Sequence, residues 1–225
     1  MAATSTPPIH PMPFTRLELA VFAVREGTLQ VLLARRAEAP HAGRWALPGG
    51  VLRVDLDASL DAAAQRVATE RLGAPLPLLR QLCAVGGPQR DPRAPWALSV
   101  VYRGLVPADA PDFSAGKRIE ALAWRSVDEA IAAPLAFDHA TLVDKAVRAM
   151  RADIDVLDLP FGCLPEAFTL GELQSFCEHV LGHPLDKSSF RRRLSDRDLL
   201  VPVEGEFRVG AFRPAQLFRG ARVGR

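Results

Sequence analysis

The chain has 225 residues, of which 48% are hydrophobic and 24% charged, a composition typical of a globular protein with one large or two modest domains. Its net charge of +2 lies wholly within residues 161–225 and by itself favours no partner. Three cysteines without a C-x-x-C pair argue against a disulfide framework and favour a reducing cytoplasm. No apolar run approaches the roughly 18 residues of a membrane span. We therefore expect a cytoplasmic protein without a membrane partner.

Residues 1–13 contain four prolines and lack the basic start and apolar stretch of a signal peptide, so we expect a disordered arm. Strands and helices alternate irregularly over residues 14–152, with strands more numerous, which is an α+β pattern. The expected strands are 17–25, 28–34, 45–47, 78–85, 97–106 and 121–124; the expected helices are 59–72, 126–132 and 138–151.

The pattern breaks at residues 153–165, where two prolines and a glycine predict a domain boundary. Thr169 and Glu172 then form a capping box for a helix that Gly182 ends. Asp186 predicts the cap of a second helix, and strand-like segments follow at 199–203, 206–209 and 216–219. This order is typical of a winged helix-turn-helix, so residues 153–225 are predicted to be a linker and a DNA-binding domain.

Residues 47–74 resemble the Nudix family, whose signature is G-x5-E-x7-R-E-U-x-E-E-x-G-U, where U is a bulky apolar residue. Leu-Pro-Gly-Gly at 47–50 matches the start of the signature, and Arg66, Glu70 and Gly73 match its helix and the end of that helix. Ala58, Val67 and Arg71 stand where the signature has glutamates, and the loop before the helix is two residues longer. The resemblance implies a Nudix fold, a mixed sheet between helices, in residues 14–152.

Active Nudix enzymes hold divalent metal ions on those glutamates and use them to hydrolyse nucleoside diphosphate derivatives. Glu70 alone remains here, beside Arg71, which would repel a metal ion or pair with Glu70. We therefore expect no catalytic residues, no metal and no cofactor. Asp55, Asp57 and Asp61 lie nearby as substitute ligands, which keeps a Nudix hydrolase of ADP-ribose type with an accessory domain as the alternative hypothesis.

The whole chain is similar to one subfamily, the Nudix-related transcriptional regulators, best known as repressors of NAD biosynthesis genes. The segments that carry the likeness occur in family order between residues 17 and 219: 35–36, 43–50, 90–93, 135–139, 168–173 and 185–192. The resemblance implies a homodimer on a palindromic operator in double-stranded DNA. It also implies that ADP-ribose or a related NAD-derived nucleotide binds the Nudix domain and releases the DNA.

A diphosphate ligand held without metal needs guanidinium groups, which pair with phosphate oxygens in bidentate fashion. The candidate ligand-binding residues are Arg35, Arg36, Arg44, Trp45, Arg66, Glu70, Arg71 and Arg93. Each arginine could equally be a solvated surface residue, and Trp45 could stack on a base or pack in the core.

Basic residues also crowd the second helix of the predicted helix-turn-helix. Phe190 and Leu194, four residues apart, are expected to face the core and to leave the cations outward. The candidate DNA-binding residues are Lys187, Ser188, Ser189, Arg191, Arg192, Arg193 and, in the wing, Arg208, with Arg213 as a further candidate. The alternatives are a solvated basic face, or a C-terminal domain that contacts protein instead of DNA.

Overall fold

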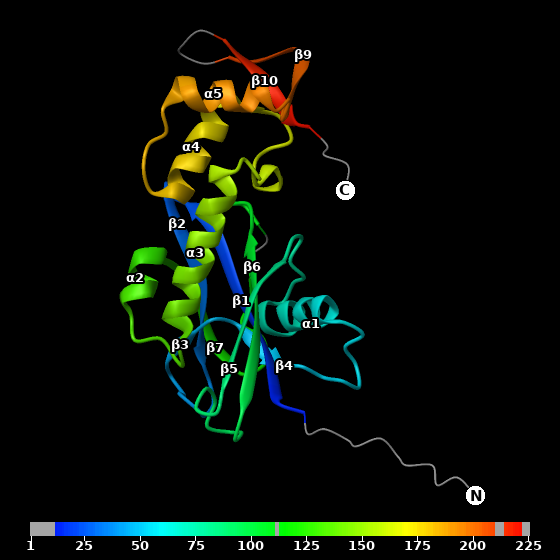
Figure 1. The fold of residues 1–225 in the computed structure, drawn as a ribbon, viewed down its shortest axis with the longest axis vertical. Helices are drawn as coiled ribbons and strands as arrows, with labels where there is room; N and C mark the ends of the chain where they lie inside the picture. The colour runs from blue at the N-terminus through cyan, green and yellow to red at the C-terminus, as the bar shows by residue number, and fades with distance from the viewer. Residues whose placement is uncertain (1–11, 111–112, 210–213, 222–225) are drawn as a thin grey trace, which may run out of the picture.

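The computed structural model describes residues 12–110, 113–209 and 214–221, so Arg213 and most of the expected arm lie outside the described residues. The first part of the chain builds a seven-stranded mixed sheet with helices on both faces (Figure 1). Its strands are β1 (Phe14–Arg25), β2 (Thr28–Arg36), β3 (Trp45–Ala46), β4 (Gly49–Val51), β5 (Arg80–Gly87), β6 (Ala97–Leu105) and β7 (Ile119–Ser126). Its helices are α1 (Leu60–Leu72), α2 (Val127–Ala132) and α3 (His139–Asp155).

Strand β1 organises this sheet. It pairs antiparallel with β2 and β4 and parallel with β6. Alternate residues point to opposite faces, so Leu17, Leu19 and Val21 pack in the core with α1, whereas Ala20 and Phe22 pack in the core with α3. Burial on both faces explains why this strand is almost continuously apolar.

Local signals in the sequence set the helix ends. Ser59 caps α1 by accepting a hydrogen bond from the Ala62 backbone N–H, and Gly73 ends α1 in the left-handed region with φ 78°. Both ends confirm the prediction. Gly49–Val51 forms β4, a strand that was not expected from the sequence, and pairs antiparallel with β1.

The C-terminal part contains a short 3-10 helix (Phe161–Cys163), β8 (Phe168–Thr169), α4 (Leu170–Leu181), α5 (Lys187–Asp196), β9 (Leu200–Arg208) and β10 (Ala215–Gly220). The strands form a separate sheet in the order β8-β10-β9. The two strands expected at 199–203 and 206–209 form one strand, β9, whose register against β10 shifts at an irregularity between them, where Gly205 has φ 73°. No helix in the described ranges combines the length and apolarity that crossing a bilayer requires.

One hydrophobic core crosses from the first part of the chain into the second. Helix α3 extends to Asp155, beyond the expected helix end at Arg151, and packs against α4. Phe168, Leu173 and Cys177 therefore belong to the same cluster as Phe22 and Leu142. The two parts stack along the long axis of the molecule, with α3 running between them (Figure 1). The winged-helix part thus rests on a continuous apolar interface.

This shared core predicts that the two parts unfold together. Leu173 is 0% exposed, so Leu173→Ala should lower the free energy of unfolding by about 2–5 kcal/mol. All three tryptophans, Trp45, Trp96 and Trp124, lie outside the C-terminal part. Tryptophan fluorescence during urea unfolding should nevertheless shift to lower urea in this variant, and should not shift in the exposed control Ser175→Ala. An unchanged fluorescence transition would contradict the cooperative core.

Candidate ligand cleft and recognition helix

A cationic cleft lies where β3 and β4 meet the start of β1 and the end of α1. Five arginine side chains line it, with Glu38 as the acidic group: Arg16, Arg36, Arg71, Arg93 and Arg118. The backbone of Leu47, Pro48 and Gly49 forms one wall, which we call the strap. Clustered guanidinium groups of this kind favour a ligand with several negative charges.

Arg71 is fixed inside the cleft by backbone carbonyls. Its Nε donates to the Gly49 carbonyl at 3.0 Å, and its Nη1 donates to the carbonyl of Lys117. Burial lowers the pKa of Arg71; Glu70 opposes this effect, and Arg118 adds to it. Burial also lowers the pKa of Arg36, again with nearby arginines adding to the effect. A bound anion would relieve this mutual repulsion.

A buried polar pair supports the strap from behind. His139 Nδ1 accepts the Leu47 backbone N–H at 2.9 Å, so the ring proton belongs on Nε2, 4.0 Å from Glu18 Oε2. Arg16 Nε donates to the other Glu18 oxygen at 2.8 Å. A Cβ on Gly49 would lie 1.9 Å from Glu18 Oε2, so only glycine fits at this position of the strap.

The remaining carboxylates of the degenerate motif are engaged by side chains. Arg66 pairs with Asp57 at 2.7 Å and with Glu70 at 3.3 Å. Asp55 pairs with Arg53, and Asp61 accepts the Tyr102 hydroxyl at 2.6 Å. Of the two roles expected for Arg71, pairing with Glu70 is not seen among the described residues; Glu70 pairs with Arg66, one helical turn before it. These acidic groups do not converge on one point.

Three of the predicted ligand-binding residues, Arg36, Arg71 and Arg93, line the cleft. The others lie outside the lining. Arg35 pairs with Glu120 and with the Gly43 carbonyl, and Arg44 is exposed. Trp45 is partly buried and packs against the larger core, with Arg125 5.9 Å above its ring.

Arg16 and Arg118 line the cleft but were missed by the sequence reasoning. Arg16 stands directly before the strand expected at 17–25, close to the polar residues Thr15 and Glu18, and carried no distinct signal. The Asp138 side chain precedes α3 but makes no cap hydrogen bond with it, and pairs with Arg90 instead. Arg90 also donates to Ser99, so this part of the 90–93 segment fastens the N-terminus of α3 to the sheet.

Helices α4 and α5 form the predicted helix-turn-helix. The Thr169–Glu172 capping box opens α4 and Gly182 ends it at φ 79°, both as predicted. The Asp186 side chain caps α5 by accepting the Ser189 backbone N–H at 2.7 Å. Phe190 and Leu194 are buried at 3% and 2% exposure, which confirms the predicted inner face of α5.

The outer face of α5 carries the exposed side chains Lys187, Ser188, Arg191 and Arg192, with Ser189 partly buried. Arg193 departs from the expectation, because its guanidinium donates to the carbonyl of Asp155 at the end of α3. Arg208 on β9 is half exposed and lies 3.3 Å from Glu172 Oε2. We therefore take the exposed face of α5 as the candidate recognition surface.

The protein-family model described as NUDIX domain matches residues 15–146, and the model described as NrtR DNA-binding winged helix domain matches residues 160–219. The ADPR responsive transcriptional repressor NtrR of Acinetobacter baylyi is 35% identical over 212 residues, covering 94% of this chain and 84% of the relative.

Two crystal structures of Shewanella oneidensis NrtR are also similar. The complex with a 27mer DNA has 32% identity and a TM-score of 0.74, covering 92% of this chain and 93% of that one. The NUDIX domain complexed with ADP ribose has 28% identity and a TM-score of 0.59, covering 66% and 95%. The fold and the two sites thus define a Nudix domain joined to a winged-helix DNA-binding domain. The chain belongs to the NrtR family of Nudix-related transcriptional regulators.

The buried His139 predicts a pH dependence of stability. Burial lowers its pKa from 6.5 to about 4, against the opposing charges of Glu18 and Asp138. The unfolded chain therefore binds a proton that the folded chain rejects, and stability falls as pH drops from 6.5 towards 4. Over this range the wild type should lose about 3 kcal/mol more than His139→Gln in urea unfolding. The exposed His183→Gln is the control and should lose as much stability as the wild type. An equal loss in the wild type and in His139→Gln would refute the lowered pKa of His139.

Proposed function

We propose that this protein is a DNA-binding transcriptional repressor whose Nudix domain senses ADP-ribose or a related NAD-derived nucleotide. The observation that carries the proposal is the pairing of two cationic surfaces, the arginine-lined cleft and the exposed face of α5. The names of the Acinetobacter and Shewanella relatives support both proposed partners, DNA and ADP-ribose. The protein acts in the cytoplasm as a homodimer.

In the cleft, Arg36, Arg71 and Arg93 bind the diphosphate together with Arg16 and Arg118. Arg71 stands at a signature position where active Nudix enzymes have a metal-binding glutamate. A guanidinium there supplies positive charge directly and removes the need for a bridging metal ion. Ligand binding should therefore be independent of divalent cations.

The cleft gives a direct prediction for Arg71. Arg71→Ala removes a charge-assisted contact, so ADP-ribose affinity measured by calorimetry should fall by about tenfold or more. The wild-type affinity should be the same in EDTA and in Mg²⁺. Arg44→Ala, exposed and outside the cleft lining, is the matched control and should bind like the wild type. A wild-type protein that needs Mg²⁺ for binding would contradict the role of Arg71.

We also propose that the domain does not turn its ligand over. Glu70 and Asp57 both pair with Arg66, which leaves them poorly placed to hold a metal ion. Incubation with ADP-ribose and Mg²⁺ or Mn²⁺ should release no AMP or ribose phosphate above background. Turnover that disappears in Glu70→Gln would instead establish the hydrolase alternative.

On the DNA side, Arg191, Arg192 and Lys187 lie against the duplex, with Ser188 and Ser189 at the N-terminus of the recognition helix. Arg208 extends the contact through the wing. Arg193 holds the end of α3 and stands outside this set. In the dimer, two such helices read half-sites of a palindromic operator, one or two helical turns apart.

The double variant Arg191→Ala, Arg192→Ala should lose DNA affinity on the order of 100-fold in gel shifts with the upstream DNA of its own gene. The slope of affinity against salt concentration should also become shallower, because fewer counterions are released. The control, Arg148→Ala, removes an exposed arginine from α3. Normal DNA binding by the double variant would show that the recognition helix has been placed wrongly.

A further inference from the structure

The basic side chains of the described C-terminal part fall into two groups. Four of them are bonded to the protein itself: Arg193 to the Asp155 carbonyl, Arg197 to the Val156 carbonyl, Arg208 to Glu172 and Arg219 to Glu166. The other three lie on α5, are exposed, and form no hydrogen bond or ion pair with any described residue: Lys187, Arg191 and Arg192. These three cations are therefore free to bind another molecule.

Two features fix the rotation of α5 about its own axis. Phe190 and Leu194 are buried and define its inner face. On one flank, Arg193 donates to the carbonyl of Asp155 at the end of α3. Each residue advances about 100° around an α-helix, and Arg192 is two residues away from both Phe190 and Leu194. Arg192 therefore stands almost directly opposite the core, at the outermost position of the helix.

Lys187 and Arg191 occupy a different direction on the same helix. Arg191 stands about 100° away from Arg192, on the flank opposite Arg193, and Lys187 lies one turn before Arg191 on that flank. A helix in the major groove turns its outermost residues towards the base edges and its flanks towards the sugar-phosphate ridges. The rotation of α5 thus aims Arg192 at base pairs and the other two cations at phosphates.

The neighbours of Arg192 on the outer face leave it room to reach the bases. Ser188 and Ser195, about one turn before and after it, are exposed and short, so no long side chain screens the guanidinium on these sides. Asp196, one turn after Arg192, carries a negative charge that phosphates would repel. This charge favours an orientation in which the N-terminal half of α5 enters the groove and its last turn stays away from the DNA backbone.

We propose that Arg192 is the specificity-determining residue of α5. Its guanidinium donates two hydrogen bonds to O6 and N7 of one guanine in each operator half-site, while Lys187 and Arg191 bind phosphate oxygens. The role of Arg192 rests on the proposed DNA binding and adds which cation recognises sequence. Two parallel donors need the planar fork of arginine, which lysine lacks, whereas a phosphate contact needs only a positive charge.

Single variants separate the two roles. Affinity is measured by fluorescence anisotropy, without ADP-ribose, on the upstream DNA of the protein's own gene and on a shuffled fragment of the same length and composition. Arg192→Lys keeps the charge but loses the fork, so its preference for the upstream fragment should fall about tenfold or more. Arg191→Ala should weaken binding to both fragments by a similar factor and make the salt dependence shallower by about one charge.

The outcomes distinguish this assignment from the proposed function. Arg148→Ala, an exposed arginine of α3, is the control and should match the wild type on both fragments. An unchanged preference in Arg192→Lys, or a loss of preference in Arg191→Ala as large as in Arg192→Lys, would overturn the role of Arg192 alone. A wild type that binds both fragments equally would overturn the proposed function, and the role of Arg192 with it.

A modified probe tests the guanine directly. Replacing every guanine of the upstream fragment by 7-deazaguanine removes the N7 acceptor and leaves Watson–Crick pairing intact. The wild type and Arg191→Ala should bind the modified fragment about tenfold more weakly than the unmodified one. Arg192→Ala should bind both fragments with equal affinity, because it lacks the donor to N7. A tenfold difference that persists in Arg192→Ala would show that another residue contacts N7 and would overturn the proposal.

Discussion

Helix α3 is the element on which the arrangement of both sites depends. At its N-terminus, His139 accepts a hydrogen bond from the strap of the ligand cleft. At its C-terminus, the Asp155 carbonyl accepts one from Arg193 of α5, the candidate recognition helix. The 17 residues of α3 span about 25 Å as a rigid rod. One helix therefore links the strap to α5 through a hydrogen bond at each of its ends.

The cleft shows how one fold can change its chemistry while keeping its frame. The helix with its Ser59 cap and Gly73 end, and the strap with Gly49 against Glu18, depend on local geometry and remain intact. Replacing a metal-binding carboxylate by Arg71 reverses the sign of the charge at that point. Under the proposed function, the altered site attracts a diphosphate because a guanidinium supplies the positive charge that a metal ion otherwise brings.

Features set by neighbours in sequence were predictable, and those set by distant contacts were not. The caps at Ser59, Thr169 and Asp186 follow from residues within one turn of the helix. Arg118 reaches the cleft only because a loop far along the chain lies beside the end of α1. The turn of Arg193 towards α3 likewise depends on how two parts of the chain pack. Sequence periodicity places a residue on a face but cannot name its partner across the fold.

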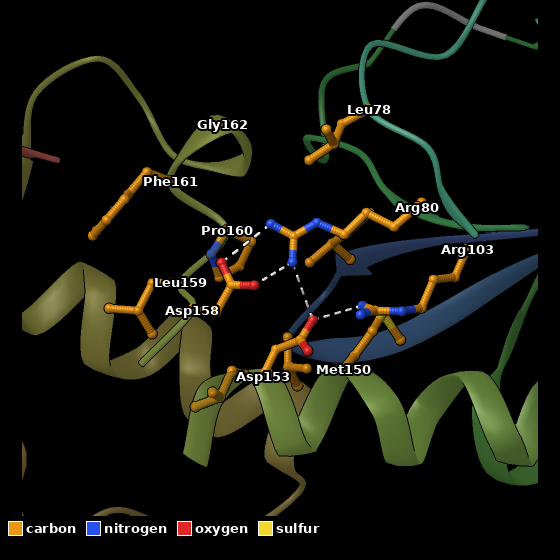
Figure 2. A pocket seen from close by; sticks show the side chains of 14 residues that line it. Leu78, Arg80, Arg103, Met150, Asp153, Asp158, Leu159, Pro160, Phe161 and Gly162 are labelled. Atoms are coloured by element: carbon orange, nitrogen blue, oxygen red, sulfur yellow. Dashed lines mark hydrogen bonds and ion pairs between the residues drawn. The ribbon is translucent and has the colours of Figure 1, made fainter. Parts of the chain in front are cut away.

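Stability and orientation at the junction come from different forces. The apolar core that joins Phe22 and Leu142 to Leu173 supplies most of the binding between the two parts, but hydrophobic contact is non-directional and tolerates sliding. The ion pairs of Arg80 and Arg103 with Asp153 and Asp158 add little net energy at partly exposed positions. Their fixed geometry instead selects one register of α3 against the β5–β6 edge. The junction thus combines non-directional apolar packing with a few polar contacts of defined geometry (Figure 2).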